Sequence, residues 1–124
     1  MNNNNSFEIK ALLDVIVKGM QEKKAENITI IDLREIENSA CDYFVITNAS
    51  SNTQVDAIAD SIQKETLEAL GDKAWHKEGT ESSEWILMDY VNVVAHIFQT
   101  PVREFYALEE LWADAAITVI KDLN

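Results

Sequence analysis

The sequence SEWILMDYVNVVAHIF, from Ser83 to Phe98, is the most apolar stretch of the chain. Alternate residues along it sort onto two faces that are both largely apolar, a pattern typical of strands covered on both sides. We therefore expect two sheet strands joined by a turn at Tyr90 and Val91, with Trp85 opposite His96. A two-residue turn needs positive φ at both positions, which the β-branched Val91 resists, so a wider turn stays open as an alternative.

Asp89 and His96 both lie in this stretch and raise the question of an acid–base pair. In the register with a turn at Tyr90 and Val91, they are about four residues apart along the sheet, or roughly 13 Å. A hydrogen bond does not span that gap, which argues against a catalytic pair. We interpret His96 first as a half-buried strand histidine that hydrogen-bonds a neighbour, with contact to a partner as the alternative.

The chain before this stretch predicts one long helix and three further strands. Apolar residues recur at helical spacing from Ile9 to Met20, which predicts an amphipathic helix capped by Ser6. Gly19 is a mild defect inside that helix. The expected strands are Asn27–Leu33, Asp42–Asn48 and Lys73–Gly79.

Two more helices are expected on either side of the opening stretch. Ser51 and Gln54 have the spacing of a capping box at the start of one helix, and Gly71 suits its end. Thr100, followed by a proline, marks the start of another helix. Its apolar residues do not share one face, so we expect a break near Ala107.

The predicted order of elements is α-β-β-α-β-β-β-α, with residues 115–124 ambiguous between helix and strand. It predicts an α/β or α+β fold, a mixed sheet of about five strands with helices packed on it. At 124 residues we expect a single domain over residues 6–124, preceded by a disordered tail over residues 1–5.

The charge of the chain restricts the class of partner. The sequence has 22 acidic and 10 basic residues, a net charge of −12. Such a surface repels nucleic-acid backbones and attracts basic proteins. The single cysteine, Cys41, excludes an internal disulfide and fits a reducing cytoplasm. The sequence has neither a signal peptide nor the apolar run of a membrane span, so we expect a cytoplasmic protein.

Few residues of the sequence are candidates for metal binding, nucleophilic catalysis or phosphate binding. The two histidines, His76 and His96, lack metal-ligand spacing, which predicts no metal site. Cys41 is interpreted as a small buried residue, because Asp42 and Glu37 would raise the pKa of its thiol. The loop TNASSNTQ, from Thr47 to Gln54, precedes a helix and could receive phosphate, but it lacks the glycine and lysine of a P-loop. Helix capping is the favoured interpretation there.

Four segments together resemble a known family, the ribosomal silencing factors, also called Iojap-related proteins. The resemblance covers about Leu12 to Trp112, and the order and spacing of its segments are specific. This chain has Val91-Asn92 where the family usually has Gly-Asp, and Thr53 where it often has a basic residue. The segments are DYFVITNASSNTQVDAIAD (Asp42–Asp60), Glu78-Gly79, WILMDYVNVVAHIF (Trp85–Phe98) and REFYALEELW (Arg103–Trp112).

The resemblance implies a fold related to nucleotidyltransferases but without catalysis, and the chain lacks the Gly-Ser motif and paired carboxylates of those enzymes. It implies a translation inhibitor that binds a large-subunit ribosomal protein on the intersubunit face and sterically blocks joining of the small subunit. It also implies a homodimer when free, and no cofactor. Two alternatives stay open: a degenerate nucleotidyltransferase-like enzyme or phosphate-binding protein, and a large-subunit assembly factor.

The resemblance also suggests which residues contact that partner. Aromatic and basic motif positions would lie nearest to it, and acidic ones would complement its charge. The expected partner-binding residues are Trp85, Asp89, His96, Phe98, Arg103, Glu104, Tyr106 and Trp112.

Overall fold

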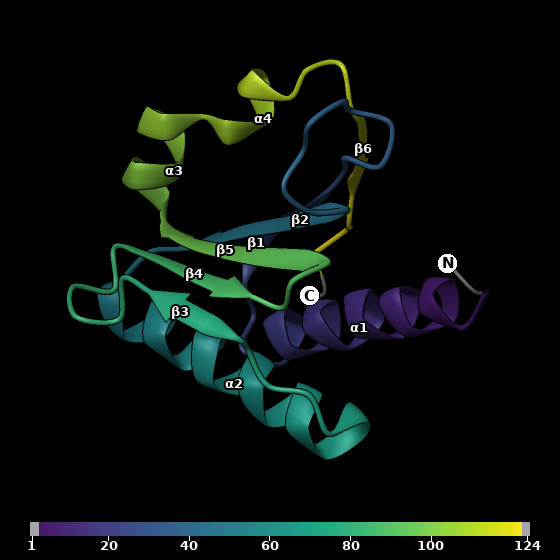
Figure 1. Ribbon diagram of the computed structural model, residues 1–124. Coiled ribbons are helices and arrows are strands. Elements are labelled where there is room, and N and C mark those ends of the chain that lie inside the picture. Colours follow the sequence, from purple (N-terminus) through teal and green to yellow (C-terminus); the bar gives the residue numbers. More distant parts are fainter. Residues whose placement is uncertain (1–2, 123–124) are drawn as a thin grey trace.

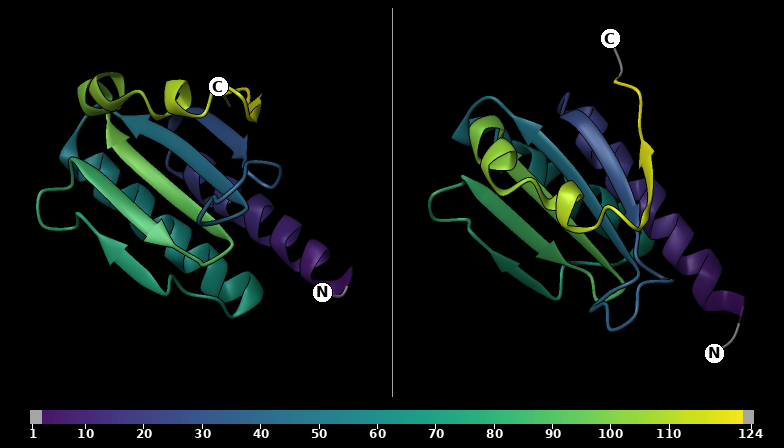
Figure 2. Two further views of the ribbon diagram at one scale, coloured as in Figure 1. Left: turned by 45° about the horizontal axis from the view of Figure 1, so that its top comes forward. Right: turned by 90° about the horizontal axis from the view of Figure 1, so that it is seen from above.

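Two long helices cover one face of a six-stranded mixed sheet in the computed structural model, which describes residues 3–122 (Figure 1). Two short helices lie over the opposite face (Figure 2). The predicted fold class is confirmed, with six strands in place of about five. The elements are α1 (Asn3–Glu22), β1 (Glu26–Asp32), β2 (Tyr43–Ala49), α2 (Asn52–Leu70), β3 (His76–Glu78), β4 (Trp85–Asp89), β5 (Val93–Gln99), α3 (Thr100–Tyr106), α4 (Leu108–Leu111) and β6 (Ala116–Val119).

The strands lie in the order β3-β4-β5-β2-β1-β6. β2 and β5 pair in parallel at the centre, and every other neighbouring pair is antiparallel. A parallel pair needs a crossover connection, which α2 supplies together with β3 and β4. The sheet is therefore mixed, with one parallel pair at its centre and antiparallel pairs on both sides.

The sixth strand comes from the segment that the sequence pattern left ambiguous. β6 pairs antiparallel with β1 and forms one edge of the sheet (Figure 2). All four of its residues are exposed. A strand that buries neither face shows no alternation, so hydrophobic periodicity does not separate it from a helix.

The register of the β4–β5 hairpin differs from the one predicted for a turn at Tyr90 and Val91. Trp85 pairs with Phe98, and His96 pairs with Leu87. The turn lies one residue further along the chain, at Val91 and Asn92, because the Tyr90 N–H donates to the carbonyl of Val93 over 2.8 Å. Only one residue of this turn, Val91, has a positive φ, of 77°.

Two predicted helix starts are also corrected. α1 begins at Asn3, so Ser6 is not its N-cap, and residues 3–5 of the predicted tail belong to the helix. No glycine or proline stands between them and Ser6 to stop the helix. Met1 and Asn2 lie outside the described residues. At α2, Ser51 Oγ accepts from the Gln54 N–H over 3.2 Å, but the Gln54 amide donates to the carbonyl of Lys23 instead of completing a capping box.

Each face of the sheet has its own apolar cluster. The larger one packs α1 and α2 against residues of β2, β4 and β5 such as Val45, Ile86 and Ile97. The smaller one lies beneath α3 and α4 and includes Ile46 and Phe98. This confirms that the strands of the opening stretch have two apolar faces. Within residues 3–122, no helix has the length and hydropathy to cross a membrane.

Gly19 lies at a close contact between α1 and α2. A Cβ atom at this position would lie 2.8 Å from the Cα of Ile62. The Ser61 hydroxyl also donates to the Gly19 carbonyl over 2.8 Å. Gly19 is thus a requirement of helix packing and not a defect of α1.

We expect Gly19→Ala to lower the free energy of unfolding by about 1–3 kcal/mol, because the added methyl group overpacks the α1–α2 contact. This outweighs the gain of up to about 1 kcal/mol that alanine gives in a helix interior. Urea unfolding followed by circular dichroism measures the change. Asp14→Ala on the exposed side of α1 is the control and should stay within about 0.5 kcal/mol of wild type. Equal or higher stability of Gly19→Ala would contradict the packing described here.

Candidate functional site

Trp85 and His96 are joined by a side-chain hydrogen bond on the face that α3 covers. Trp85 lies opposite Phe98 and diagonal to His96, and its Nε1–H donates to His96 Nδ1 over 3.1 Å. An indole nitrogen can only donate, so Nδ1 must be the accepting nitrogen of the imidazole. The proton of the neutral ring therefore lies on Nε2.

The other nitrogen of His96 has no protein partner. His96 is 4% exposed, and no group within residues 3–122 accepts a hydrogen bond from Nε2. Burial lowers the pKa of the ring from 6.5 to about 4, so the neutral form prevails at neutral pH. An unpaired buried donor costs about 1–3 kcal/mol. It is the only buried side-chain nitrogen or oxygen without a partner in the described part of the chain.

Asp89 and His96 lie closer together than the predicted register allowed, but they do not form an acid–base pair. Asp89 is opposite Val94, two residues along β5 from His96, so the separation of four residues was wrong. Asp89 Oδ1 instead accepts from the Val91 N–H over 2.7 Å. The carboxylate thus stabilises the hairpin turn, and the interpretation of His96 as a strand histidine bonded to a neighbour is confirmed.

Aromatic side chains continue from Trp85 to the surface of α3. The Trp85 ring lies 4.7 Å from Phe98 and 4.9 Å from Tyr106, between centroids. Tyr106 is 48% exposed, and its neighbour Phe105, 5.1 Å away, is 81% exposed. We call Trp85, Phe105 and Tyr106 the aromatic surface. Glu104, also exposed, precedes it in the same helix.

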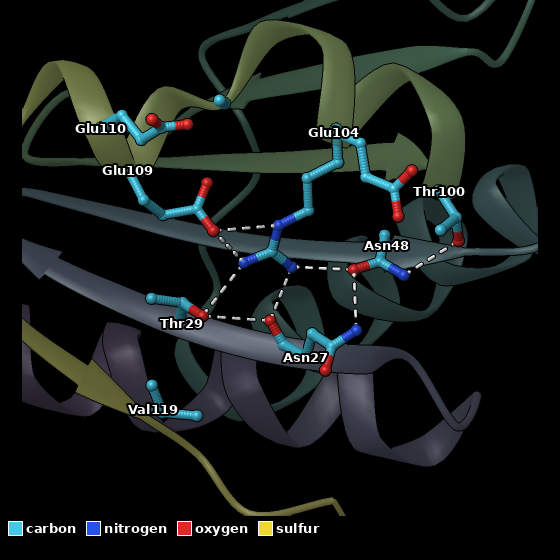
Figure 3. A pocket seen from close by; sticks show the side chains of 10 residues that line it. Asn27, Thr29, Asn48, Thr100, Glu104, Glu109, Glu110 and Val119 are labelled. Carbon is cyan, nitrogen blue, oxygen red and sulfur yellow. Dashed lines mark hydrogen bonds and ion pairs between the residues drawn. The ribbon is translucent and has the colours of Figure 1, made fainter.

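Arg103 connects α3 to α4 and to the sheet through its guanidinium group, whose partners Asn27, Thr29, Asn48 and Glu109 are labelled in Figure 3. Its Nη1 donates to the carbonyl of Asn27 over 2.6 Å and to Asn48 Oδ1 over 2.9 Å. Its Nη2 donates to Thr29 Oγ1 over 3.1 Å and forms an ion pair with Glu109 over 2.6 Å. Four partners from β1, β2 and α4 therefore converge on one guanidinium group.

The predicted break near Ala107 is confirmed and serves this arrangement. Ala107 has a φ of 46°, which ends α3 and lets α4 turn so that Glu109 faces Arg103. Sequence reasoning identified Arg103 only as a partner contact and missed Asn27, Asn48 and Glu109. An asparagine at positive φ, as at Asn27, is compatible with a turn but does not reveal what its carbonyl accepts.

The predicted partner-binding residues fall into three groups by exposure. Glu104 and Tyr106 are exposed, whereas Trp85, Asp89 and Trp112 are partly buried. Phe98, His96 and Arg103 are buried, so their side chains present almost no surface in this chain. The structure therefore brings His96, Phe98 and Tyr106 together around Trp85, whereas Trp112 packs against Phe44.

A second feature lies on the same face of the sheet, towards β3. A hollow of about 550 Å³ is lined chiefly by apolar side chains and reaches Cys41 and His96. Cys41 is buried, which raises the pKa of its thiol to about 11, with Asp89 and Asp42 adding to the effect. The prediction of a small buried cysteine is confirmed, and its pKa is raised as predicted, but chiefly by burial and with no contribution from Glu37. Among the described residues, no three histidine, cysteine, aspartate or glutamate side chains gather as a metal site would require.

The loop before α2 has a structural role in this chain. Ser51 caps the helix, and Asn52 Nδ2 donates to the carbonyl of Ser82 over 3.0 Å. Asn52 Oδ1 also accepts from the Gln99 amide. The polar side chains of the loop therefore hold α2 to neighbouring segments, which supports helix capping as the interpretation.

Comparison with known proteins extends over nearly the whole chain. The family model described as "Ribosomal silencing factor during starvation" matches residues 6–124. The chain is 36% identical to "Ribosomal silencing factor RsfS" of Bacillus subtilis, over 87% of this chain and 90% of that protein. It is 28% identical to the mouse "Mitochondrial assembly of ribosomal large subunit protein 1", over 81% of this chain but 44% of that protein. A crystal structure of a Chromobacterium violaceum protein superposes with a TM-score of 0.79 at 31% identity, over 85% of this chain and 86% of that one.

We expect the protein to become less stable as the pH is lowered, because His96 binds a proton more readily in the unfolded state. Because the folded-state pKa lies below the ordinary value, the unfolded state binds the proton first as the pH drops. The contribution of the neutral His96 ring to the free energy of unfolding is complete above the unfolded pKa of 6.5. It is lost as the pH approaches about 4. It amounts to on the order of 3 kcal/mol. Urea unfolding between pH 7 and pH 4.5 should show a smaller loss in His96→Gln than in wild type, and equal slopes would contradict the assignment.

We expect Arg103→Met to lower the free energy of unfolding by about 2–4 kcal/mol, because it removes the ion pair with Glu109 and the guanidinium donors to Asn27, Asn48 and Thr29. Arg34→Met is the matched control. Arg34 pairs with Asp32 over 2.8 Å, but its side chain is 58% exposed, so its loss should cost less than about 1 kcal/mol. Urea unfolding measures both variants. Similar losses for the two would show that the Arg103 contacts stabilise the fold no more than a surface ion pair does.

Proposed function

The chain belongs to the ribosomal silencing factor family, and from that premise we propose that it lowers translation by occupying the large ribosomal subunit. In this proposal it binds a basic large-subunit protein on the face that meets the small subunit. The bound domain then sterically blocks subunit joining. The mechanism needs neither a cofactor nor catalysis, because a bound domain prevents joining by its volume.

The aromatic surface is the observation that carries the proposal. Phe105 is 81% exposed and Tyr106 is 48% exposed, although a free chain gains nothing from leaving large aromatic side chains in water. Tyrosine and tryptophan are enriched among the residues that dominate binding energy in interfaces. The packing of Tyr106 against Trp85 gives this surface a rigid base.

Charge supports a basic protein as the partner. The chain carries a net charge of −12, and Glu104 and Glu110 are exposed on α3 and α4 near the aromatic surface. These carboxylates would steer the domain towards lysine and arginine side chains. They would also oppose direct contact with ribosomal RNA.

In this proposal, some of the predicted contact residues touch the partner and others position those that do. Tyr106, Trp85 and Glu104 would touch the partner, together with Phe105, which the sequence prediction omitted. His96, Phe98 and Arg103 would act from below by holding Trp85 and α3 in place. Asp89 and Trp112 would lie at the margins of the surface.

A role in assembly of the large subunit is the second candidate. The name of the mouse relative assigns assembly to that protein, whose other half has no counterpart in this chain. The same aromatic surface would serve either role, since both require binding to the large subunit. We further propose, on the family resemblance, that the protein is cytoplasmic and is a homodimer when free.

Sedimentation of separated ribosomal subunits tests the leading proposal. We expect the purified protein to sediment with the large subunit and to prevent formation of joined ribosomes when the small subunit is added. Normal joining at saturating protein would refute the proposal. Sedimentation with an immature large subunit only would favour the assembly role.

Two phenylalanines on opposite faces locate the binding surface. Phe105→Ala should weaken binding to the large subunit by about tenfold or more, because it removes an exposed aromatic anchor. Phe7→Ala removes an equally accessible phenylalanine, 74% exposed, from α1 on the other face and should bind as wild type does. Equal binding by the two variants would exclude the aromatic surface as the contact.

A further inference from the structure

The hollow near β3 is separate from the aromatic surface. Trp75 and Leu87 line it, as do Phe44 and Val94 on its inner side. Trp85 and Tyr106 are not among its lining residues, so His96 stands between the two features, bonded to Trp85 on one side and lining the hollow on the other. We call this feature the β3 hollow.

The imidazole of His96 is one of the few polar groups in the lining of the β3 hollow. Since His96 Nδ1 accepts from Trp85, Nε2 carries a proton that no protein group accepts. Nε2 has almost no accessible surface, so a ligand in the hollow would contact the ring without a hydrogen bond to this donor. The proton on Nε2 disfavours a metal ion, which would need an unprotonated nitrogen.

The charged and apolar residues that line the β3 hollow restrict which ligands it can bind. Glu78 and Asp89 line it, so an anionic ligand would be repelled and a basic one attracted. Trp75 also lines it and is 79% exposed. The Trp75 N–H donates to the carbonyl of Asp89 over 2.7 Å, which holds the backbone of this tryptophan against β4. An apolar side chain entering the hollow could therefore pack against the indole ring of Trp75, whose backbone is fixed to β4.

We propose that the β3 hollow binds a short segment of a basic protein, which inserts one apolar side chain beside the imidazole of His96. Lysine or arginine residues beside the inserted side chain would pair with Glu78 and Asp89. The source of the segment, a large-subunit ribosomal protein, rests on the proposed function. The hollow would then form a second contact with the partner that binds the aromatic surface.

A blocked tripeptide of lysine, phenylalanine and lysine tests the chemistry directly. Protein labelled with ¹⁵N in its histidines shows the Nε2 proton of His96 by nuclear magnetic resonance. We expect this proton to be present in the free protein and its resonance to shift in a saturable manner as the tripeptide is added, because the inserted phenylalanine ring would lie beside the imidazole. Replacing both lysines by glutamate, or the phenylalanine by glycine, should weaken binding about fivefold or more.

Two variants locate the bound tripeptide. Trp75→Ala should weaken its binding about fivefold or more, because the inserted side chain loses its cover. Leu67→Ala removes an apolar side chain that is 43% exposed on α2 and should not change binding. No movement of the His96 proton at millimolar tripeptide would overturn the proposal. Equally tight binding of free phenylalaninamide would also overturn it and assign the hollow to small molecules.

Sedimentation with the large subunit separates this inference from the proposed function. If Trp75→Ala also binds the large subunit more weakly than Leu67→Ala does, the ribosomal source of the segment is supported. If the tripeptide binds but Trp75→Ala binds the large subunit as wild type does, that source is wrong while the proposed function stands. If wild type fails to bind the large subunit, the proposed function falls, and the tripeptide result still supports the hollow as a peptide site.

Discussion

The parallel pairing of β2 with β5 is the constraint on which the rest of the structure depends. Parallel strands end at the same edge of the sheet, so the end of β2 at Asn48 meets the start of α3 at Thr100. The Thr100 hydroxyl accepts from Asn48 Nδ2 over 3.0 Å and donates to the carbonyl of Ala49 over 3.2 Å. α3 therefore begins at a fixed point, from which Arg103 reaches the sheet and Tyr106 reaches Trp85.

The two faces of the sheet differ in the side chains that cover them. α1 and α2 close one face with aliphatic side chains and with the tight contact at Gly19. The other face carries aromatic rings, one unpaired imidazole donor and exposed carboxylates, and α3 and α4 cover only part of it. Buried residues such as Phe98 and His96 support Trp85, and the accessible residues stand on that support. A surface prepared in this way suits a protein that acts by binding.

The sequence predicted the elements better than their contacts. Hydrophobic periodicity located α1, α2 and the central strands because each has a buried face, and it failed at β6, where no residue is buried. The hairpin register depended on whether Val91 tolerates a positive φ, which local pattern alone does not decide. The prediction that Trp85 and His96 lie together was right, although the register behind it was wrong, because diagonal neighbours on a sheet also touch. The Arg103 network joins residues up to 76 positions apart, and such contacts follow only from the folded topology.

The central claim is that the protein silences translation by occupying a surface needed for subunit joining. Its most direct test compares two reconstituted translation reactions, one started from separated subunits and one from ribosomes already joined on a message. The account predicts that the protein inhibits the first reaction in proportion to its binding to the large subunit and leaves the second unaffected. Equal inhibition of both reactions would contradict it, because a protein excluded from joined ribosomes does not slow their elongation.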